Sequence, residues 1–504
     1  MTTAQYDIVI IGSGMGGLVC GDLLSREGYK VCVLEKNKQI GGCLQTYVRE
    51  KVVFDSGVHY LGGLEKGQNL YQVFKYLGIM DKLKIERMPL DVFDKIIIGG
   101  DDKEYVFAQG YENFIQKLLV DFPQEEQALR LYCEKIQDVC ARFPLYNLRP
   151  GGGFTEKAGV MDIDTRAFIK SITTNIKLQE VLAGNNMLYA GQGGKTPFYV
   201  HAMILNSYIE SSWKCINGGS QIGKWLAKNI TDRGGAIKRN CAVNKIVVEE
   251  GKVSHVTTDG GERIYAANFI SNIHPVKTLE MTETELIKNV YRNRLKSLEN
   301  SISTFTLNII FKENDFPYFQ HNYYYFDEGR VWTMAEYTEE DWPVGYVIFL
   351  APDKSKKYAA AMTVLAYMRY DEVKQWENTF NTVSEQVNRG TDYDEFKRMK
   401  AEKLIDRVAE KFPGLRDCIQ SYYSSTPLSY RDYIGNDDGS MYGIVKDHND
   451  PYKTFIAART KLPNLYFTGQ NLNLHGILGT TMTGLVTCIE FLGDEGIVEK
   501  IKNA

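Results

Sequence analysis

The sequence predicts an α/β protein with two domains, one of which is discontinuous along the chain. A strand, a glycine-rich turn, a helix and a second strand open the chain, and another strand–helix pair closes it. A chain of 504 residues also exceeds what one hydrophobic core normally organises. We therefore expect a Rossmann-type domain on a parallel sheet, plus an α+β domain with a mixed sheet and covering helices.

The opening unit is the clearest part of this pattern. Residues 6–11 (YDIVII) form an apolar run typical of a buried parallel strand. Residues 15–28 predict a helix, and residues 30–35 (KVCVLE) predict the next strand. Together they form a βαβ unit, which is the nucleus of a dinucleotide-binding domain.

The turn inside this unit fits the pattern G-x-G-x-x-G, written in full as Gly12-Ser13-Gly14-Met15-Gly16-Gly17. The first glycine allows a tight turn, the second lets the backbone approach a pyrophosphate, and the third allows close helix–strand packing. The helix N-terminus then faces the phosphate charge. Glu35, at the end of the second strand, can accept hydrogen bonds from a ribose hydroxyl. The fingerprint alone does not separate FAD from NAD.

Further elements are expected along the rest of the chain. Helical spacing of apolar residues predicts helices over 112–140, most of 165–211, 220–234, 392–412 and 479–493. Thr391 and Asp394 predict a capping box for the fourth of these helices. Strands are expected at 242–249, 253–258, 263–270, 303–311, 345–350 and 464–468.

Composition excludes several classes of function. The formal net charge of −4 does not suit a nucleic-acid-binding protein. The 9 cysteines are scattered without a C-x-x-C pair, which argues against a disulfide framework or a zinc site, and the 7 histidines lack the spacing of metal ligands, so no metal is expected. A reducing compartment, the cytoplasm, is favoured. No signal-peptide or membrane-spanning pattern is visible, and peripheral membrane contact is left open.

Three segments resemble the phytoene desaturase and amine oxidase superfamily of flavoproteins. Glu35-Lys36, Gly41-Gly42, Thr46 and Phe54-Asp55-x-Gly57 are similar to the run that follows the family's fingerprint. The stretch from Gly218-Gly219-Ser220 through Val243 to Asn272 resembles the segment that returns to the FAD domain. Asn464 to Gln470, with Gly476, Gly479 and Thr480, resembles the C-terminal FAD motif, although Gln470 stands where many relatives have an acidic residue.

The resemblance implies FAD as cofactor, with an FAD-binding domain formed by residues 1–75, 215–280 and 455–504. Residues 76–214 and 281–454 would form the substrate-binding domain. The electron donor or acceptor is left open, with NAD(P)H as one candidate. The cofactor-binding residues that the resemblance implies are Gly12, Ser13, Gly14, Met15, Gly16, Gly17, Glu35, Lys36, Gly41, Gly42, Val243, Gly469, Gln470, Asn471, Gly479 and Thr480.

Within the superfamily, Gly41 to Thr46 and Phe54 to Gly62 look most like the retinol saturase branch. That likeness implies hydride transfer at flavin N5 on a hydrophobic polyene or isoprenoid, as retinol saturase-like reduction or as carotenoid desaturation or isomerisation. Saturation needs a proton donor, and His59 and Tyr60 are the catalytic candidates, with simple packing as the alternative. His475 has either a capping or a catalytic role, and Cys43 is expected to be a buried filler.

A hydrophobic tunnel is expected to end at the flavin. Its predicted lining is Phe168, Met187, Leu188, Tyr189, Phe198, Tyr199, Tyr323, Tyr324, Tyr325, Phe326 and Trp332. Two rival interpretations remain. One is a flavin amine oxidase or porphyrinogen oxidase on the same scaffold, and the other is a non-catalytic prenyl or lipid carrier, against which the intact fingerprint argues.

Overall fold

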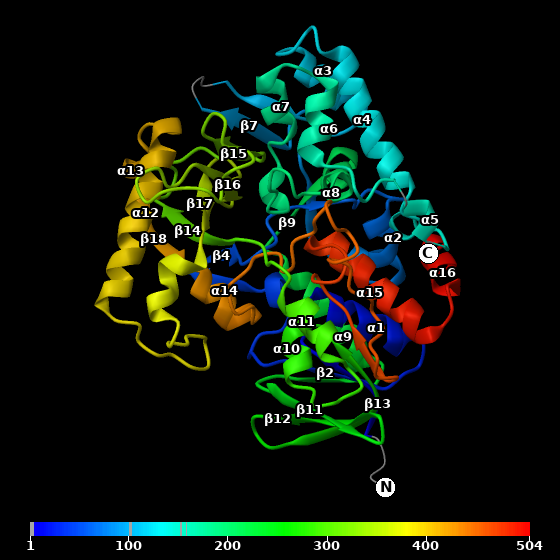
Figure 1. Cartoon of the computed structure of the whole chain (residues 1–504). Helices are drawn as coiled ribbons and strands as arrows, with labels where there is room; N and C mark the ends of the chain where they lie inside the picture. The colour runs from blue at the N-terminus through cyan, green and yellow to red at the C-terminus, as the bar shows by residue number, and fades with distance from the viewer. Residues whose placement is uncertain (1–4, 100–102, 152–153, 158) are drawn as a thin grey trace.

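The computed structural model describes residues 5–99, 103–151, 154–157 and 159–504. Two large sheets organise these residues, and the chain passes between them more than once (Figure 1). The first sheet has the strand order β10-β2-β1-β13-β12-β11, and β19 also pairs with β13. Its strands are β1 (Tyr6–Ile11), β2 (Val31–Leu34), β10 (Ala236–Lys238), β11 (Val243–Glu249), β12 (Lys252–Thr258), β13 (Arg263–Ser271) and β19 (Leu465–Phe467).

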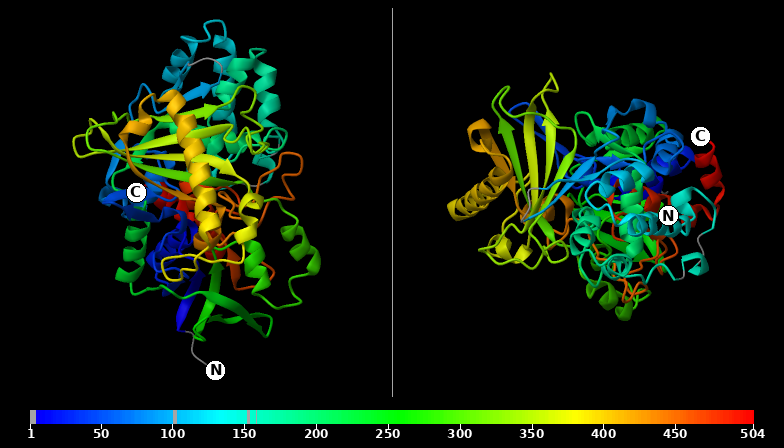
Figure 2. Two further views of the ribbon diagram at one scale, coloured as in Figure 1. Left: turned by 90° about the vertical axis from the view of Figure 1, so that its left-hand side faces the viewer. Right: turned by 90° about the horizontal axis from the view of Figure 1, so that it is seen from above.

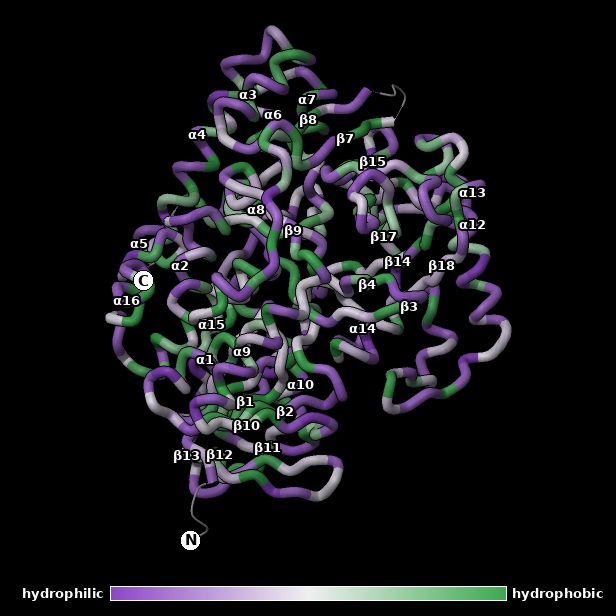
Figure 3. Tube along the Cα trace, turned by 180° about the vertical axis from the view of Figure 1, so that it is seen from behind, coloured by the Kyte–Doolittle hydropathy of each residue, from purple (hydrophilic) through white to green (hydrophobic). Residues whose placement is uncertain are grey.

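The centre of the first sheet is parallel, as expected of a Rossmann-type fold. Strands β10, β2, β1, β13 and β19 pair in parallel, whereas β11, β12 and β13 form an antiparallel meander. Alternate residues of β1 enter two different cores, Ile8 and Ile10 on one face and Val9 and Ile11 on the other. Both faces are therefore covered, and hydrophobic colour gathers around β1, β2 and β10 in Figure 3.

Helices α1, α9 and α15 pack beside one another on the first sheet (Figure 1). Their apolar side chains share one core with Ile8 and Ile10 of β1. The helices of this part of the molecule are α1 (Met15–Arg26), α2 (Asn69–Tyr76), α9 (Ser220–Asp232), α10 (Pro275–Glu280), α11 (Asn289–Lys296), α15 (Gly476–Leu492) and α16 (Gly496–Lys502). The N-terminal ends of α1 and α15 both follow strands of this sheet, β1 and β19, which brings those two helix ends close together.

The second sheet is mixed and has the order β18-β14-β17-β16-β15-β7-β8. Only the β7–β15 pair of this order is parallel. The long helix α12 (Thr391–Lys411) covers one face of the sheet (Figure 2). The strands are β7 (Asp94–Ile98), β8 (Tyr105–Phe107), β14 (Ser303–Phe311), β15 (Asn322–Phe326), β16 (Gly345–Pro352), β17 (Ala359–Met368) and β18 (Ile419–Ser425).

A helical layer and two small sheets complete the described part of the chain. The helices are α3 (Tyr111–Leu119), α4 (Glu126–Ala141), α5 (Phe154–Lys157), α6 (Thr165–Ile172), α7 (Ile176–Leu182), α8 (Phe198–Glu210), α13 (Leu415–Cys418) and α14 (Pro427–Ile434). The small sheets contain β3 (Thr46–Arg49) with β4 (Val52–Asp55), and β5 (Leu61–Gly62), β9 (Ser212–Cys215) and β6 (Ile85–Arg87). Short 3₁₀ turns are η1 (Gly42–Leu44), η2 (Met80–Lys82), η3 (Leu145–Asn147), η4 (Asn186–Leu188) and η5 (Tyr370–Trp376).

The predicted fold class is confirmed, and the predicted strands and most helices lie where the sequence puts them. Two local predictions are wrong. The helix expected over 112–140 is divided into α3 and α4, because Pro123 lies between them and cannot continue a helical hydrogen-bond ladder. The predicted capping box does not form: Gly390 is the N-cap, with φ of 93° and no side chain to cap the helix, and Thr391 is already the first helical residue.

No helix in the described part of the chain is long and apolar enough to cross a membrane.

Candidate active site

A cavity of about 390 Å³ lies where β1 and β2 end and extends to one face of the second sheet. In open α/β folds, ligands bind outside the carboxyl ends of the parallel strands. The lining combines backbone from the glycine-rich segments of the first sheet with side chains from α8 and the second sheet. The cavity therefore has two chemically different parts, which we call the cradle and the apolar wall.

The cradle begins at the fingerprint. Gly12 has φ of +94°, a conformation that side-chain-bearing residues rarely adopt. Gly14 is the N-cap of α1, so the unpaired amides at the start of this helix open towards the cavity. A Cβ on Gly17 would lie 2.3 Å from the carbonyl oxygen of Gly12, which leaves no room for any side chain there. This turn thus has the shape and the partial positive charge that suit a phosphate group.

The carboxylate of Glu35 is held in place at the edge of the cradle. Its Oε2 accepts hydrogen bonds from the backbone N–H and the hydroxyl of Ser13, and its Oε1 accepts one from Asn37 N–H at 2.9 Å. Lys36 follows, and its Nζ donates to the carbonyl oxygen of Asp432 at 2.7 Å. Burial, together with the nearby Lys277 ammonium, lowers the pKa of Lys36 to about 8.

Two further glycine segments close the cradle. Gly41 N–H donates to the carbonyl oxygen of Ser13 at 3.1 Å, which ties the Gly41-Gly42 turn to the fingerprint. From the other side, β19 leads into Gly469, whose φ is +97°. A Cβ on Gly16 would lie 2.9 Å from the backbone of Gly469, so the two ends of the chain touch here. Asn272 fills the space between them, and its Nδ2 donates to the carbonyl oxygen of Gly12 at 3.3 Å.

The apolar wall is one face of the second sheet. Tyr324 on β15, Val347 on β16 and Leu365 on β17 lie in register across three adjacent strands, and all three line the cavity. Met203, Ile204 and Tyr208 of α8 lie at the same part of the cavity. Such a wall can hold apolar groups away from water. It offers large hydrophobic side chains, and none of the wall residues named above is charged.

A buried polar cluster lies behind this wall. The hydroxyl of Tyr60 donates to Oδ2 of Asp94 at 2.8 Å and is 2.7 Å from the hydroxyl of Tyr324. Asp94 is fully buried and also accepts hydrogen bonds from the amides of Asn185 and Asn322, at 2.6 and 2.8 Å. Burial raises the pKa of Asp94 to about 7, although those hydrogen bonds act in the opposite direction.

Comparisons with known proteins agree with this architecture. Residues 10–77 match the model of the NAD(P)-binding Rossmann-like domain. The chain is 26% identical to all-trans-retinol 13,14-reductase of Danio rerio, over 96% of this chain and 85% of that protein. It is 25% identical to the chloroplastic prolycopene isomerase of Daucus carota, over 98% of this chain and 81% of that protein. Over nearly its whole length the chain is thus similar to proteins named as a retinol reductase and a prolycopene isomerase.

Among solved structures, an engineered putrescine oxidase shares the fold, with a TM-score of 0.65, 13% identity and coverage of 97% of this chain and 100% of that one. The Rossmann segment and this oxidase-like fold imply a cofactor of the flavin type. The relatives are named as reductases and isomerases, and this chain is an oxidoreductase.

The structure brings the predicted cofactor-binding residues together, with one exception. Gly17 does not line the cavity, because it faces the Gly12 carbonyl inside the turn. The residues that do line it are Gly12, Ser13, Gly14, Met15, Gly16, Glu35, Lys36, Gly41, Gly42, Val243, Gly469, Gln470, Asn471, Gly479 and Thr480. Their roles in binding remain predictions.

The candidate catalytic residues His59 and Tyr60 both line the cavity, but their surroundings differ. The His59 ring stacks on Phe349 at a centroid distance of 4.2 Å. Burial, together with the Lys214 ammonium, lowers the pKa of His59 to about 3, so this imidazole is neutral at neutral pH and lacks the acidic proton of an imidazolium ion. Tyr60 holds a hydroxyl within the polar cluster, and this contrast favours Tyr60 as a participant in proton transfer.

His475 and Cys43 also line the cavity. His475 stacks on Tyr442 at 4.3 Å, and its Nε2 lies 3.2 Å from the carbonyl oxygen of Leu188. Burial lowers the pKa of His475 to about 4 and raises that of Cys43 to about 11, so both groups are neutral at physiological pH. These contacts favour packing and positioning for both residues.

Most of the predicted tunnel residues do not line the cavity. Met187, Leu188 and Tyr324 do, whereas the other aromatics pack within the core of the second sheet and the helical layer. On β15 the cause is the two-residue period of a strand: Tyr324 faces the cavity, while Tyr323 points the other way and packs on Phe412 at 5.5 Å. The residues for which the prediction was wrong are Phe168, Tyr189, Phe198, Tyr199, Tyr323, Tyr325, Phe326 and Trp332.

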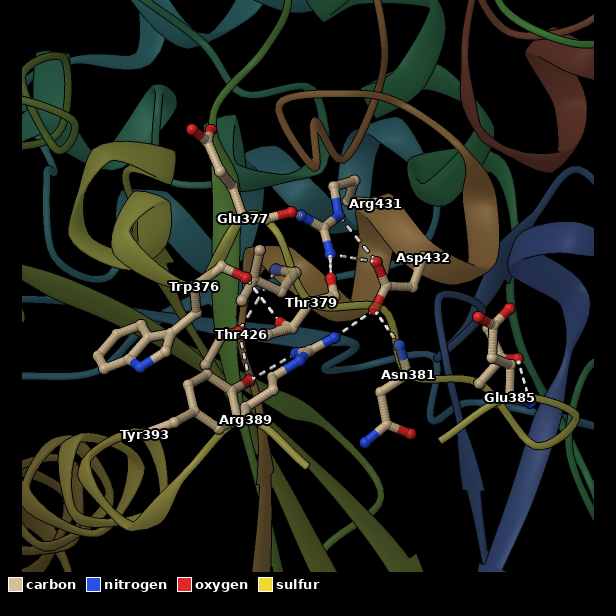
Figure 4. A network of polar contacts seen from close by, with 12 residues as sticks. Trp376, Glu377, Thr379, Asn381, Glu385, Arg389, Tyr393, Thr426, Arg431 and Asp432 are labelled. Carbon is tan, nitrogen blue, oxygen red and sulfur yellow. Dashed lines mark hydrogen bonds and ion pairs between the residues drawn. The ribbon is translucent and has the colours of Figure 1, made fainter. Parts of the chain in front are cut away.

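Sequence reasoning missed the end of α14 and the segment that follows it. Tyr433, Gly435 and Asn436 line the cradle, and Met441 and Tyr442 line the cavity further along. Figure 4 shows how this segment is fixed: Asp432, at the end of α14, faces Arg389 and Arg431. The backbone N–H of Asn381 also donates to Asp432, at 2.9 Å. No sequence motif indicates these residues, because the Arg389–Asp432 ion pair joins positions 43 apart and leaves no local pattern.

Proposed function

We propose that this protein is an FAD-dependent oxidoreductase that reduces a conjugated double bond in an isoprenoid or polyene lipid. The observation that carries the proposal is the joining of the cradle and the apolar wall in one cavity. A cofactor that lies along the cradle would meet a substrate held on the wall. The relatives named as retinol reductase and prolycopene isomerase act on polyenes of this kind, which supports the substrate class.

The residues of the cradle fit FAD. The open turn at Gly12 and Gly14 leaves room for a pyrophosphate, which FAD contains and FMN lacks. The carboxylate of Glu35, fixed by Ser13, can accept hydrogen bonds from the hydroxyls of an adenosine ribose. Val243, Gly479 and Thr480 also line the cavity. We expect Val243 to contact the adenine end of FAD and the N-terminal turn of α15 to face the flavin.

When bound, the flavin supplies hydride transfer to or from carbon. The chain itself contributes binding, orientation and exclusion of water. Apolar side chains of the wall, such as Val347 and Phe349, can hold an extended polyene through buried area alone, at about 25 cal/mol for each Å². Peripheral contact with a membrane, from which such a lipid would come, stays a prediction.

The amine oxidase alternative is less well supported. The similarity to putrescine oxidase indicates a shared fold and does not indicate a shared substrate. A cationic amine at the apolar wall would need a carboxylate or an aromatic cage with water access. The described wall residues carry no acidic side chain, and the buried Asp94 lies behind Tyr60.

The test uses the purified holoprotein. The released nucleotide is identified by mass after denaturation, and we expect FAD. The holoprotein is then reduced with dithionite under anaerobic conditions and mixed with all-trans-retinol or with lycopene, and oxidised holoprotein is mixed with putrescine as the control. Reoxidation of the flavin together with loss of polyene absorbance supports the proposal. A colourless protein that cannot bind added FAD contradicts it, and so does reduction of the oxidised flavin by putrescine when neither polyene reoxidises the reduced flavin.

A further inference from the structure

The polar cluster behind the wall forms a chain of hydrogen bonds that ends at the cavity. Asp94 on β7 and Asn322 on β15 are register partners, and Tyr324 lies two residues after Asn322 on the same face. The hydroxyl of Tyr60 connects the two strands, because it is 2.8 Å from Asp94 Oδ2 and 2.7 Å from the Tyr324 hydroxyl. Asp94 itself does not line the cavity, whereas Tyr60 and Tyr324 do.

The two tyrosine hydroxyls differ in what remains available to a substrate. Tyr60 uses its hydroxyl twice, towards Asp94 and towards Tyr324. Within the described part of the chain, Tyr60 is the hydrogen-bond partner of the Tyr324 hydroxyl. When the carboxyl of Asp94 carries a proton, it can donate to Tyr60, and Tyr60 can then donate to Tyr324. The O–H of Tyr324 is then directed to a group inside the cavity.

We propose that Tyr324 donates the proton of the reduction and that Tyr60 and Asp94 replace this proton from behind. This inference rests on the proposed function for its direction, since only reduction consumes a proton at carbon. Tyr324 would be the catalytic residue, because it alone of the three would donate directly to the substrate. Tyr60 and Asp94 would act through Tyr324: Tyr60 would relay the proton, and Asp94 would be its reserve.

One olefinic carbon receives a hydride, with its two electrons, from the reduced flavin-type cofactor. The electron pair of the double bond then forms a new C–H bond with the proton of Tyr324, whose O–H bond breaks. The Tyr324 oxygen takes the proton of Tyr60, and the Tyr60 oxygen takes that of Asp94. Asp94 is left as a carboxylate and regains a proton from solvent before the next turnover.

Other charged and titratable groups around Asp94 are compatible with its role as the proton reserve. Lys214 on β9 is half-buried, and its Nζ is buried without a hydrogen-bond partner among the described residues. Its field favours the carboxylate that the step leaves behind. Burial lowers the pKa of Lys214 itself to about 8. Burial raises the pKa of Tyr208, another neighbour of Asp94, and the Asp94 carboxylate adds a smaller increase. With a pKa of about 7, Asp94 keeps its proton below neutral pH and loses it above.

Infrared spectroscopy tests the reserve without any turnover. The holoprotein is titrated from mildly acidic to alkaline pH, and the carbonyl band of protonated carboxyls is recorded. Burial also raises the pKa of Asp55, so the difference between wild type and Asp94→Asn isolates the Asp94 band. We expect this band at acidic pH and its loss through about pH 7. A difference spectrum without such a band overturns the proposal.

Tyr60→Phe provides a second test of the Asp94 band in case the Asp94→Asn variant does not fold. It removes one hydrogen bond to Asp94, so the carbonyl band should shift in frequency. Tyr323→Phe is the matched control, because Tyr323 is the neighbour of Tyr324 on the opposite face and donates to Glu104 at 3.1 Å. The control should leave the band where it is in wild type. Equal spectra for Tyr60→Phe and wild type would contradict the relay.

Single-turnover kinetics test whether Tyr324 is the proton donor. Dithionite-reduced holoprotein is mixed with all-trans-retinol, and the loss of polyene absorbance is followed across pH. Tyr324→Phe should slow this loss by about 100-fold or more at unchanged retinol affinity, the size expected for a lost proton donor. Tyr60→Phe should slow it less and remove the decline of the rate above pH 7, whereas Tyr323→Phe should match wild type. A Tyr324→Phe rate equal to that of wild type overturns the proposal.

The two kinds of failure are distinguishable. If wild type consumes no polyene, the proposed function fails, and the infrared titration alone then decides whether Asp94 is a proton reserve. If wild type consumes retinol but Tyr324→Phe does so equally fast, the proposed function stands and the relay is wrong.

Discussion

The cradle and the apolar wall are two ways to build a binding surface. The cradle consists mainly of backbone from short contiguous segments, with positive φ at Gly12, Gly41 and Gly469. The wall consists of side chains that strands β15, β16 and β17 and helix α8 bring together from distant parts of the chain. A cradle of this kind tolerates almost no added atom, whereas a side-chain wall can repack around changes of shape.

The largest effect on the shape of the cradle is expected at Gly17, inside the turn that forms it. In Gly17→Ala, the new Cβ would lie 2.3 Å from the Gly12 carbonyl oxygen, so backbone must move. We expect a loss of about 3 kcal/mol in the free energy of unfolding, the upper part of the range for overpacking. Thermal and urea denaturation of the apoprotein measure it. Gly223→Ala is the control, since its Cβ would meet side chains at 3.4 Å, and equal stability of the two variants would contradict the expectation.

Gly14→Val should separate cofactor binding from folding. Gly14 has φ of −61°, which a valine can adopt, and its Cβ would meet the Nδ2 of Asn272 at 2.8 Å. That amide can move, but the valine would then occupy the space over which a pyrophosphate passes. We expect a folded, colourless protein that does not retain FAD. Visible absorbance after gel filtration is the measurement, and a yellow Gly14→Val protein would show that the cradle is assigned to the wrong loop.

Asp432→Asn should have an intermediate effect, because it acts on the cradle from outside. Arg389 has 5% of its side chain exposed, and the substitution leaves its charge without a partner inside the protein (Figure 4). Breaking such a buried pair costs about 3–5 kcal/mol. We also expect weaker retention of FAD, since Tyr433 and Gly435 follow directly and line the cradle.

Asp437→Asn is the matched control for this variant. Asp437 pairs with Lys277 at 2.6 Å, but 79% of its side chain is exposed, so the pair should contribute less than about 1 kcal/mol. Denaturant unfolding and FAD titration of both variants give the comparison. Equal losses in the two would mean that the Arg389–Asp432 pair does not support the cradle.

Those parts of the fold that depend on local signals could be predicted from the sequence. The strand β1, the glycine turn and the helix α1 follow each other within 21 residues, so hydrophobic pattern and turn chemistry locate them together. Tertiary contacts are not visible in this way. Gly390, rather than Thr391, caps α12, and Pro123 divides a periodic apolar stretch into α3 and α4.

The same distinction holds for the site. Residues such as Gly12, Glu35 and Gly469 belong to short motifs, and the structure places them around one cavity. The polar cluster of Asp94, Tyr60 and Tyr324 depends on the pairing of β7 with β15, which lie 228 positions apart in chain order. Because register decides which face of a strand is buried, a prediction that named Tyr323 and Tyr324 alike could be right for only one of them.

The smallest effect is expected for Cys43→Ser, at the point where the cradle meets the wall. Cys43 lines the cavity next to Gly42, and its position beside a cofactor would suit a redox role. Burial, however, raises the pKa of its thiol to about 11, so the reactive thiolate is almost absent at neutral pH. Serine is close in size, and its hydroxyl loses only part of the packing. We therefore expect full FAD retention and a change of less than about 1 kcal/mol in the free energy of unfolding. Flavin absorbance per protein and denaturant midpoints measure both, and a bleached Cys43→Ser protein would mean that side chains, as well as backbone, hold the cofactor in the cradle.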